Sequence, residues 1–205
     1  MATRIEYFDE KILQCSKKEF LEKGFTNASL RTIAQNAEVS TSTIYTRYTD
    51  KEGLFRFIVE PVADGFKNLL SQYLYDFSKL PKAEQGTKMK DYSDKGFSDL
   101  LSFVFSHFEE FKLIVTCAPG NFYQDFLESI VEIDSSYMKK YLVQIKSKAM
   151  RNGRITDGFL HVVSSGFYSG LFEVVIHDMP HKDAKKYLKE LRIFYNDGWK
   201  QYMES

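Results

Sequence analysis

Small hydroxyl side chains and one arginine crowd a short stretch of the sequence, residues 41–48. Hydroxyl groups donate and accept hydrogen bonds, and arginine adds paired charged donors, so this combination suits contact with phosphates and base edges. A helix this short and polar has too little apolar surface to exist for stability alone. The side chains expected to point outward are Thr41, Ser42, Thr43, Thr46 and Arg47.

Two short helices joined by a tight turn are needed to position these side chains. The apolar stripe of the first helix consists of Leu30, Ile33, Ala34 and Ala37. This i, i+3, i+4, i+7 spacing is typical of a helix packed on one side. Ser29 and Ser40 stand where their hydroxyls can cap the two helices, and Val39 can fill the angle between them. In the second helix Ile44 and Tyr48 lie four apart and point back to the first.

A gapless run of residues carries the spacing of a known family. It consists of Gly24-Phe25, Ala28-Ser29-Leu30-Arg31, Ile33-Ala34, Ala37, Val39-Ser40, Thr43-Ile44-Tyr45, Tyr48, Lys51-Glu52 and Leu54. At these positions the chain resembles the tetracycline-repressor-like (TetR) family of bacterial transcription regulators. The resemblance implies a helix-turn-helix that binds double-stranded DNA. Ser42 departs from it, because the family often has glycine there; its hydroxyl can replace a bare N–H contact.

The resemblance implies a role for each residue of the reading surface. Arg31 and residues 41–43 would reach bases or phosphates, while Tyr45 and Tyr48 would pack on the DNA backbone. The positive charge of Lys51 is unfavourable at the N-terminus of the helix that it begins, because that end of the helix dipole is also positive. A phosphate bound there would explain why the sequence has a lysine at this position. The predicted DNA-binding residues are Arg31, Thr41, Ser42, Thr43, Tyr45, Arg47, Tyr48 and Lys51. Thr49 to Glu52 predicts a capping box, with Glu52 reaching back.

Net charge is zero over the 205 residues, and the first sixty residues also balance. Proteins that bind DNA usually carry excess lysine and arginine, so modest non-specific affinity is predicted. Two other interpretations stay open. The chain could be a small-molecule-binding or protein-interaction module that has lost DNA binding, in which case the helical pair is an ordinary hairpin of an all-α core. It could also be a helical enzyme that uses the aromatic side chains as a pocket, although no paired acid and base is found for it.

Helical periodicity continues along the rest of the chain and predicts an all-α fold. The expected helices cover residues 4–23, 51–60, 62–77, 97–117 with a break near 109–110, 121–151, 157–177 and 181–203. Residues 80–94 are polar and form either a surface loop or the start of the next helix. Because a proline disfavours helical geometry in the preceding residue, Pro61 predicts the end of a helix. We therefore expect a three-helix helix-turn-helix head, residues 1–60, and a helical ligand-binding and dimerisation domain, residues 61–205.

The second domain is expected to join two copies of the chain. The family resemblance implies that the last two helices pair across a two-fold axis. Small residues at 164–166 and 169–170 would let another helix approach closely, although internal packing explains them equally well. A homodimer would read adjacent major grooves of a palindromic operator.

The family also implies a ligand pocket in this domain, and an aromatic content of 16% fits an apolar or aromatic effector. A packed core accounts for the same aromatics. The residues expected to line the pocket are Phe103, His107, Phe111, Tyr123, Phe126, Phe167 and Tyr168.

Catalytic and metal sites find little support in the sequence. His177 and His181 lie four apart, but Pro180 breaks the helix that would align them on a metal. No phosphate loop, Cys-x-x-Cys pair or nucleophile elbow occurs, so neither enzyme activity nor a cofactor is expected. The sequence has no run of about 18 apolar residues and its start lacks the apolar segment of a signal peptide. The expected location is the cytoplasm, with no membrane partner.

Overall fold

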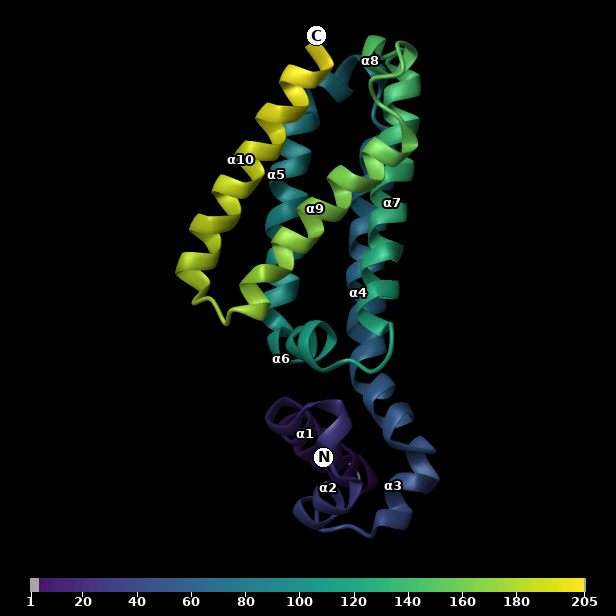
Figure 1. The fold of residues 1–205 in the computed structure, drawn as a ribbon, viewed down its shortest axis with the longest axis vertical. Coiled ribbons are helices and arrows are strands. Elements are labelled where there is room, and N and C mark those ends of the chain that lie inside the picture. Colours follow the sequence, from purple (N-terminus) through teal and green to yellow (C-terminus); the bar gives the residue numbers. More distant parts are fainter. Residues whose placement is uncertain (1–3, 205) are drawn as a thin grey trace. The chain divides into compact units, whose positions relative to one another are not determined.

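The protein is described by a computed structural model that covers residues 4–204, with side chains except those of residues 4–8, 86, 87, 90, 203 and 204. Every regular element in this described part is a helix, which confirms the all-α prediction (Figure 1). The helices are α1 Arg4–Asn27, α2 Leu30–Asn36, α3 Thr41–Tyr48, α4 Lys51–Lys79, α5 Lys82–Ser106, α6 Phe108–Lys112, the π-helix η1 Leu113–Cys117, α7 Phe122–Gln144, α8 Lys148–Arg151, α9 Asp157–Ile176 and α10 His181–Glu204.

Contacts between residues divide the chain into two units. The first unit reaches to Gly65 and also contains His107–Tyr123, whereas the second consists of Phe66–Ser106 and Gln124–Ser205. The division into domains at residues 60 and 61 stays a prediction, because a cluster of contacts is not yet a segment that folds alone.

Aromatic rings form the core of the first unit. Phe20 and Phe55 are fully buried, with ring centroids 5.3 Å apart, and Phe25 lies 5.9 Å from Phe20. Helix α1 also holds α6, because Lys17 Nζ lies 3.0 Å from a carboxylate oxygen of both Glu109 and Glu110. Partial burial lowers the pKa of Lys17, but hydrogen bonds to the two glutamates outweigh burial and raise it.

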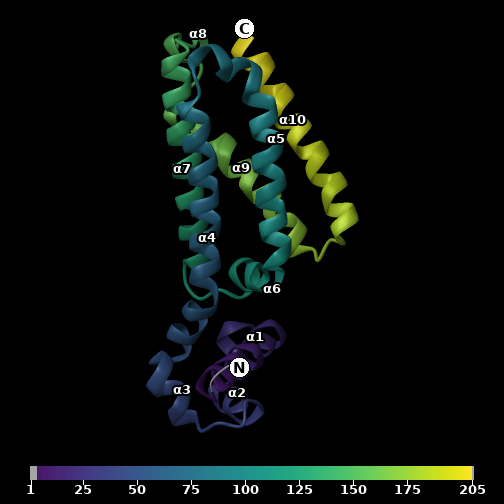
Figure 2. The same cartoon turned by 180° about the vertical axis from the view of Figure 1, so that it is seen from behind.

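Longer helices build the second unit. In both views α7 runs alongside the part of α4 that belongs to this unit (Figure 1, Figure 2). Phe66 of α4 lies in the core, with its ring centroid 6.0 Å from Phe126 of α7 and 5.7 Å from Phe172 of α9. The unit is therefore held by rings contributed from helices far apart in sequence.

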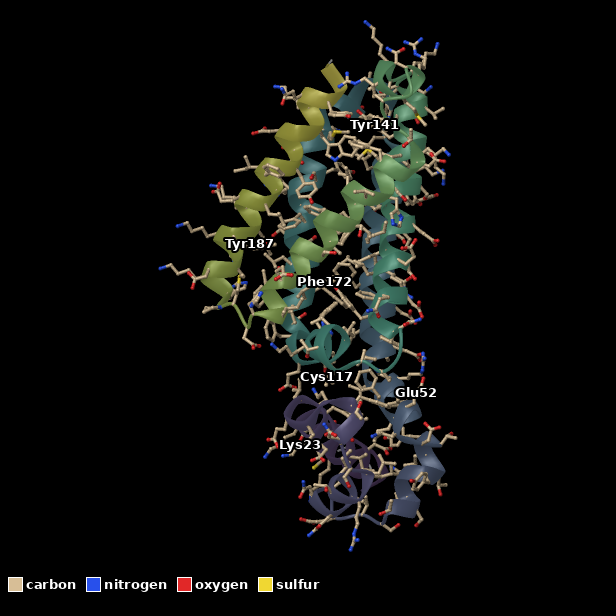
Figure 3. The ribbon with its side chains drawn as sticks, in the orientation of Figure 1. Lys23, Glu52, Cys117, Tyr141, Phe172 and Tyr187 are labelled. Carbon is tan, nitrogen blue, oxygen red and sulfur yellow. The ribbon has the colours of Figure 1, made fainter. Side chains whose placement is uncertain are left out.

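The small residues of α9 serve packing within one chain. A Cβ added at Gly170 would lie 3.0 Å from Leu191 of α10, and one at Gly166 would lie 2.6 Å from Tyr195 Oη. Tyr187, labelled in Figure 3, donates its hydroxyl to the Gly170 carbonyl at 3.2 Å. Close approach of α10 therefore accounts for these glycines.

The prediction that a helix ends before Pro61 is wrong, because α4 continues through this residue to Lys79. A proline inside a helix costs about 3 kcal/mol. Ile58, Val59 and Val62 around it are all buried, and each buried side chain of this size contributes about 1.5–3 kcal/mol. Burial on both sides of the proline thus outweighs the lost hydrogen bond.

Two predicted boundaries in the second half also shift. The break expected near residues 109–110 falls at His107, whose φ of −125° and ψ of 38° separate α5 from α6. The helix predicted over 121–151 is wrong as a single element, since it is interrupted after Gln144. Lys146 adopts a left-handed φ of 54° just after α7. Glycine is the usual residue at this position, so the sequence carries no signal that the helix ends here. Of the two alternatives for residues 80–94, the helical one holds, because α5 starts at Lys82.

Helix α9 is the one helix of the described part whose length and apolar composition would allow it to cross a membrane. Core helices of water-soluble proteins meet the same criterion, and 39% of its apolar window is already buried against the rest of the chain.

Candidate nucleic-acid interface

The start of α2 is fixed by two oxygen atoms. As predicted, Ser29 is its N-cap, and the Ser29 hydroxyl accepts the Thr32 N–H at 3.3 Å. Glu19 of α1 is only 8% exposed and accepts the Ser29 N–H at 3.0 Å. An acid of the supporting helix therefore satisfies a backbone donor just outside the helix-turn-helix.

The turn between α2 and α3 is a closed C-cap. The N–H of Glu38 donates to Gln35 O at 3.2 Å, and the N–H of Val39 donates to Ala34 O at 3.0 Å. This is the Schellman pattern, with Glu38 in the left-handed position at a φ of 58°. Glu38 also forms an ion pair with Lys11 of α1 at 2.9 Å. The turn is thus tied to the helix that supports it.

Hydroxyl groups gather at the first turn of α3. Ser40 caps the helix as predicted and accepts the Thr43 N–H at 3.2 Å. The Ser40 hydroxyl also lies 2.7 Å from Ser42 Oγ and 2.9 Å from Thr43 Oγ1. Ser42 is exposed, and Thr41 and Thr43 are half-buried. Each hydroxyl has one donor and two acceptor positions, so the cluster keeps capacity for a partner outside the protein.

The two tyrosines of α3 have different environments. Tyr45 is 51% exposed, whereas Tyr48 is 6% exposed and, with the fully buried Ile44, forms the face that packs on the first unit. The ring of Tyr48 meets Phe57 edge-on at 5.1 Å. Burial raises the pKa of the Tyr48 phenol, although the neighbouring charge of Arg47 opposes the shift. Only Tyr45 presents an open ring.

Arg47 is held by an acid of α1. Its guanidinium forms an ion pair with Asp9, which also accepts a hydrogen bond from Tyr48 Oη at 3.5 Å. Arg31 on α2 is exposed and has no ion-pair partner among the described residues. The two arginines predicted to meet DNA therefore differ, because one is neutralised within the protein and the other is open.

Lys51 has a structural partner at the position where the sequence predicted a phosphate. Its ammonium donates to the carbonyls of Thr26 and Ala28 at 3.0 and 3.1 Å and lies 4.8 Å from the ring centroid of Phe25. Thr26 lies in the last turn of α1 and Ala28 follows that helix, so Lys51 ties the end of α1 and the entry of α2 to the start of α4. This explains a cation where the helix dipole disfavours one.

The residue pairs predicted for a capping box at the start of α4 are wrong. Asp50 Oδ1 accepts the Gly53 N–H at 2.7 Å and so caps the helix. Glu52 instead pairs with Arg56 one turn later, at 2.9 Å. A Cβ on Gly53 would overlap the carbonyl oxygen of Tyr48, so only glycine allows α3 to end this close to α4.

Sequence reasoning missed Asp9, Glu19 and Gly53 in this surface. The two acids act across α1, α2 and α3, and no local spacing rule connects such distant positions. A signal for Gly53 existed, because glycine in the first turn of a helix is unfavourable unless something approaches it closely.

The seven aromatic and histidine positions expected to line a pocket fall in both units. His107, Phe111 and Tyr123 belong to the first unit, and the other four belong to the second. Within the second unit, Phe167 and Tyr168 are neighbours with ring centroids 5.3 Å apart, and Phe103 and Phe126 each contact Phe66. Two hollows lie elsewhere in this unit, and none of the seven lines either of them.

The two histidines considered as metal ligands contact different partners. His177 pairs with Glu173 at 2.9 Å, and His181 packs edge-on against Phe105 at 4.4 Å. Within the part of the chain that the structure describes, no three histidine, cysteine or acidic side chains gather into a metal-binding group.

Comparison with known proteins decides the family of this helix-turn-helix. Residues 12–58 match the sequence profile of the bacterial regulatory proteins of the tetR family. This segment, which contains α2 and α3, is therefore of the tetR type. The match supports a DNA-binding transcriptional regulator. No curated protein matches its sequence.

Solved structures share the fold of this chain along almost its whole length. A TetR-family transcriptional regulator from Mesorhizobium loti is 18% identical with a TM-score of 0.57, and the match covers 95% of this chain and 97% of that one. A protein described as a fatty acid metabolism regulator from Clostridium perfringens is 16% identical with a TM-score of 0.62, over 92% and 97%. The TetR family regulator PfmR from Thermus thermophilus is 15% identical with a TM-score of 0.58, over 88% and 96%.

Proposed function

We propose that the protein is a homodimeric, ligand-responsive repressor that binds a palindromic operator in the cytoplasm. The observation that carries the proposal is the surface of α3, where Ser42 is exposed in the hydroxyl cluster with Ser40 and Thr43, and Tyr45 is exposed about one turn later. Residues 41–43 would read base edges and phosphates, and Tyr45 would pack on the DNA backbone.

Charge at this surface favours specific over non-specific binding. Arg31 is open to a phosphate, but Arg47 is paired with Asp9 and Lys51 is engaged with backbone carbonyls. Few released counterions per subunit give a shallow dependence of affinity on salt. We infer that hydrogen bonds from α3, made by two subunits together, supply most of the discrimination between sequences.

Exposed apolar side chains on the last two helices support the homodimer. Val162 of α9 is 67% exposed, and Ile193 and Phe194 of α10 are 41% and 75% exposed. Large apolar side chains left open on adjacent helices are typical of a surface that a partner covers. A second copy would place two α3 helices on successive major grooves, about 34–36 Å apart.

The effector would enter the second unit, whose core is rich in aromatic rings. One hollow of about 70 Å³ lies between α4, α5 and α7 and is lined partly by Phe77, Tyr137 and Tyr141. Ligand sites usually measure about 300–1,000 Å³. An apolar or aromatic effector would therefore have to separate these helices, and such movement is the proposed origin of its effect on DNA binding.

The alternative is a module of the same fold that has lost DNA binding. The pairing of Arg47 with Asp9 favours it, because this pairing removes a cation from the reading surface.

The variant Tyr45→Ala distinguishes the DNA-binding repressor from the module that has lost DNA binding. Tyr45 is 51% exposed on α3, and Tyr75 of α4, which is 47% exposed, offers a matched control in the second unit. In fluorescence anisotropy with a selected duplex, we expect Tyr45→Ala to weaken binding about tenfold, equivalent to about 1.4 kcal/mol, and Tyr75→Ala to leave it unchanged. Both variants should keep the dimer mass in light scattering. Unchanged affinity in both variants would remove Tyr45 from the interface, and no binding by the parent protein would favour the module.

A further inference from the structure

The most one-sided charge of the second unit lies around α8. Residues 135–156 contain no acid, although the whole chain is neutral. The basic residues in this segment are Lys139, Lys140, Lys146, Lys148, Arg151 and Arg154.

The chain reverses here through a tight C-cap, and we call residues 142–151 the α7–α8 turn. The N–H of Lys146 donates to Val143 O at 3.1 Å, and that of Ser147 donates to Leu142 O at 3.0 Å, which is the Schellman pattern. Lys146 takes the left-handed position, where glycine is usual, with a φ of 54°. Gly153 holds the equivalent position after α8, with a φ of 72°. Lysine is less favourable than glycine in this left-handed conformation, so Lys146 places a cation on the surface at a cost in conformational energy.

The six cations divide into two groups. Lys139 pairs with Asp157 at 2.7 Å, Lys140 lies over Tyr137, and Arg154 lies over Tyr202. The other three, Lys146, Lys148 and Arg151, are exposed, and no carboxylate of the described residues pairs with them. These three cations belong to the α7–α8 turn.

Exposed apolar side chains lie in the same turn as the unpaired cations. Val143 is 60% exposed and Ile145 is 43% exposed. A hollow of about 280 Å³ opens at the same place, lined by Leu142, Val143, Lys146, Ser147, Met150 and Arg151. Figure 3 shows the neighbouring Tyr141 near the α8 end of the second unit. The turn therefore joins a concave apolar floor to a cationic rim.

We propose that the α7–α8 turn docks an acidic protein segment that carries an apolar anchor residue. The anchor enters the hollow against Val143 and Met150, and carboxylates on both sides of it meet Lys146, Lys148 and Arg151. Potentials of opposite sign across an interface steer encounter and fix register. The residues that line this hollow differ from those that line the proposed effector hollow and from the predicted DNA-binding residues.

The shape and chemistry of the turn favour this partner over others. A lipid surface would take up the exposed Val143 and Ile145 but would leave the hollow beside them unfilled. A nucleic acid backbone would use the cations but leave Val143 and Ile145 uncovered. A small ligand would fill a volume just below the usual range and leave the exposed rim unused.

The test compares the full-length protein with a triple variant, Lys146→Gly, Lys148→Gln and Arg151→Gln. Glycine suits the left-handed position and glutamine is a good helix former, so the fold is retained while three charges are removed. The probe is a fluorescent synthetic peptide of glutamates and leucines. Matched probes replace leucine by serine or glutamate by glutamine. Because three exposed charge pairs are lost together, the triple variant should bind the glutamate–leucine peptide about tenfold more weakly.

A second triple variant controls for net charge. Lys185→Gln, Lys186→Gln and Lys189→Gln remove three exposed cations of α10 and should leave peptide affinity unchanged. The serine probe should bind more weakly than the leucine probe, which shows that the hollow is used. Equal affinity in both triple variants would overturn the proposal. So would binding of anionic phospholipid vesicles or random-sequence duplex that disappears in the first triple variant while peptide binding persists.

Discussion

Helix α3 and the α7–α8 turn hold their cations in opposite ways. Arg47 of α3 is paired with Asp9, and Lys51, just beyond α3, donates to the carbonyls of Thr26 and Ala28. In the α7–α8 turn, Lys146, Lys148 and Arg151 have no carboxylate partner among the described residues. A cation is available to a partner only when its own fold leaves it unpaired, so counts of lysine and arginine along the sequence do not locate binding surfaces.

Displacement of α3 from the residues that neutralise its cations should have the largest effect on the protein. Gly53→Ala should do this, because the added Cβ overlaps the Tyr48 carbonyl oxygen and a backbone atom cannot rotate away. We expect a loss of about 2–3 kcal/mol in the free energy of unfolding, measured in urea. Gly198 of α10 has open space around it, so Gly198→Ala should instead add up to about 1 kcal/mol. Equal stability of both variants would contradict the close approach of α3 and α4.

Lys51→Ala tests whether that lysine belongs to the fold or to a phosphate. Removing its two hydrogen bonds to carbonyls should cost about 1–2 kcal/mol of stability without DNA present. Lys23→Ala, at an exposed lysine of the same unit, should change stability by less than about 0.5 kcal/mol. If Lys51→Ala lowered DNA affinity at unchanged stability, the lysine would be a phosphate contact and the contrast with the α7–α8 turn would weaken.

Asp9→Asn should convert Arg47 into an open cation like those of the α7–α8 turn. We expect affinity for random-sequence duplex to rise about threefold and the salt dependence to steepen by about one phosphate contact. Glu22→Gln changes the charge of the same helix equally and leaves Arg47 paired, so it serves as the control. Anisotropy titrations at several salt concentrations measure both slopes. Identical slopes for the two variants would mean that Asp9 does not restrain Arg47.

The smallest expected effect concerns Asp134, an acid held by hydroxyls rather than by a cation. Ser164 Oγ donates to its carboxyl group at 2.6 Å, and burial raises the pKa of Asp134 although hydrogen bonds from Ser164 and Tyr168 oppose the rise. A raised folded-state pKa gives stability that is present below the unfolded pKa, about 3.9, and is lost as pH rises through the folded value. The stability advantage of Asp134→Asn over the parent should therefore grow from about pH 4 towards neutrality. Thermal melts across this range measure it, and parallel curves would exclude the raised pKa.

Local chemistry made the helix-turn-helix predictable. Ser29 and Ser40 are caps because each lies at a helix start and accepts an N–H three residues later, and Ile44 and Tyr48 are buried because their spacing follows one helical turn. The same rules failed at Pro61, where burial on both sides outweighs a lost hydrogen bond, and at Lys146, where a lysine occupies the position usual for glycine.

Contacts between distant segments explain what the sequence could not predict about the site. Lys51 was expected to need a phosphate because its acceptors, the carbonyls of Thr26 and Ala28, are more than twenty residues away. Arg47 was expected to be open for the same reason, since Asp9 lies on another helix. Periodicity gives the face of a helix, but the partner of a charge on that face depends on how helices pack.

Selection of bound duplexes from a random pool by the purified protein tests the central claim most directly. If α3 is the reading helix of a dimer, we expect enrichment of a two-fold-symmetric site whose half-sites lie about one helical turn apart. The variant Tyr45→Ala should lose that enrichment. Failure to enrich any sequence, even at low salt, would contradict the assignment of α3 as the reading helix of a dimeric repressor.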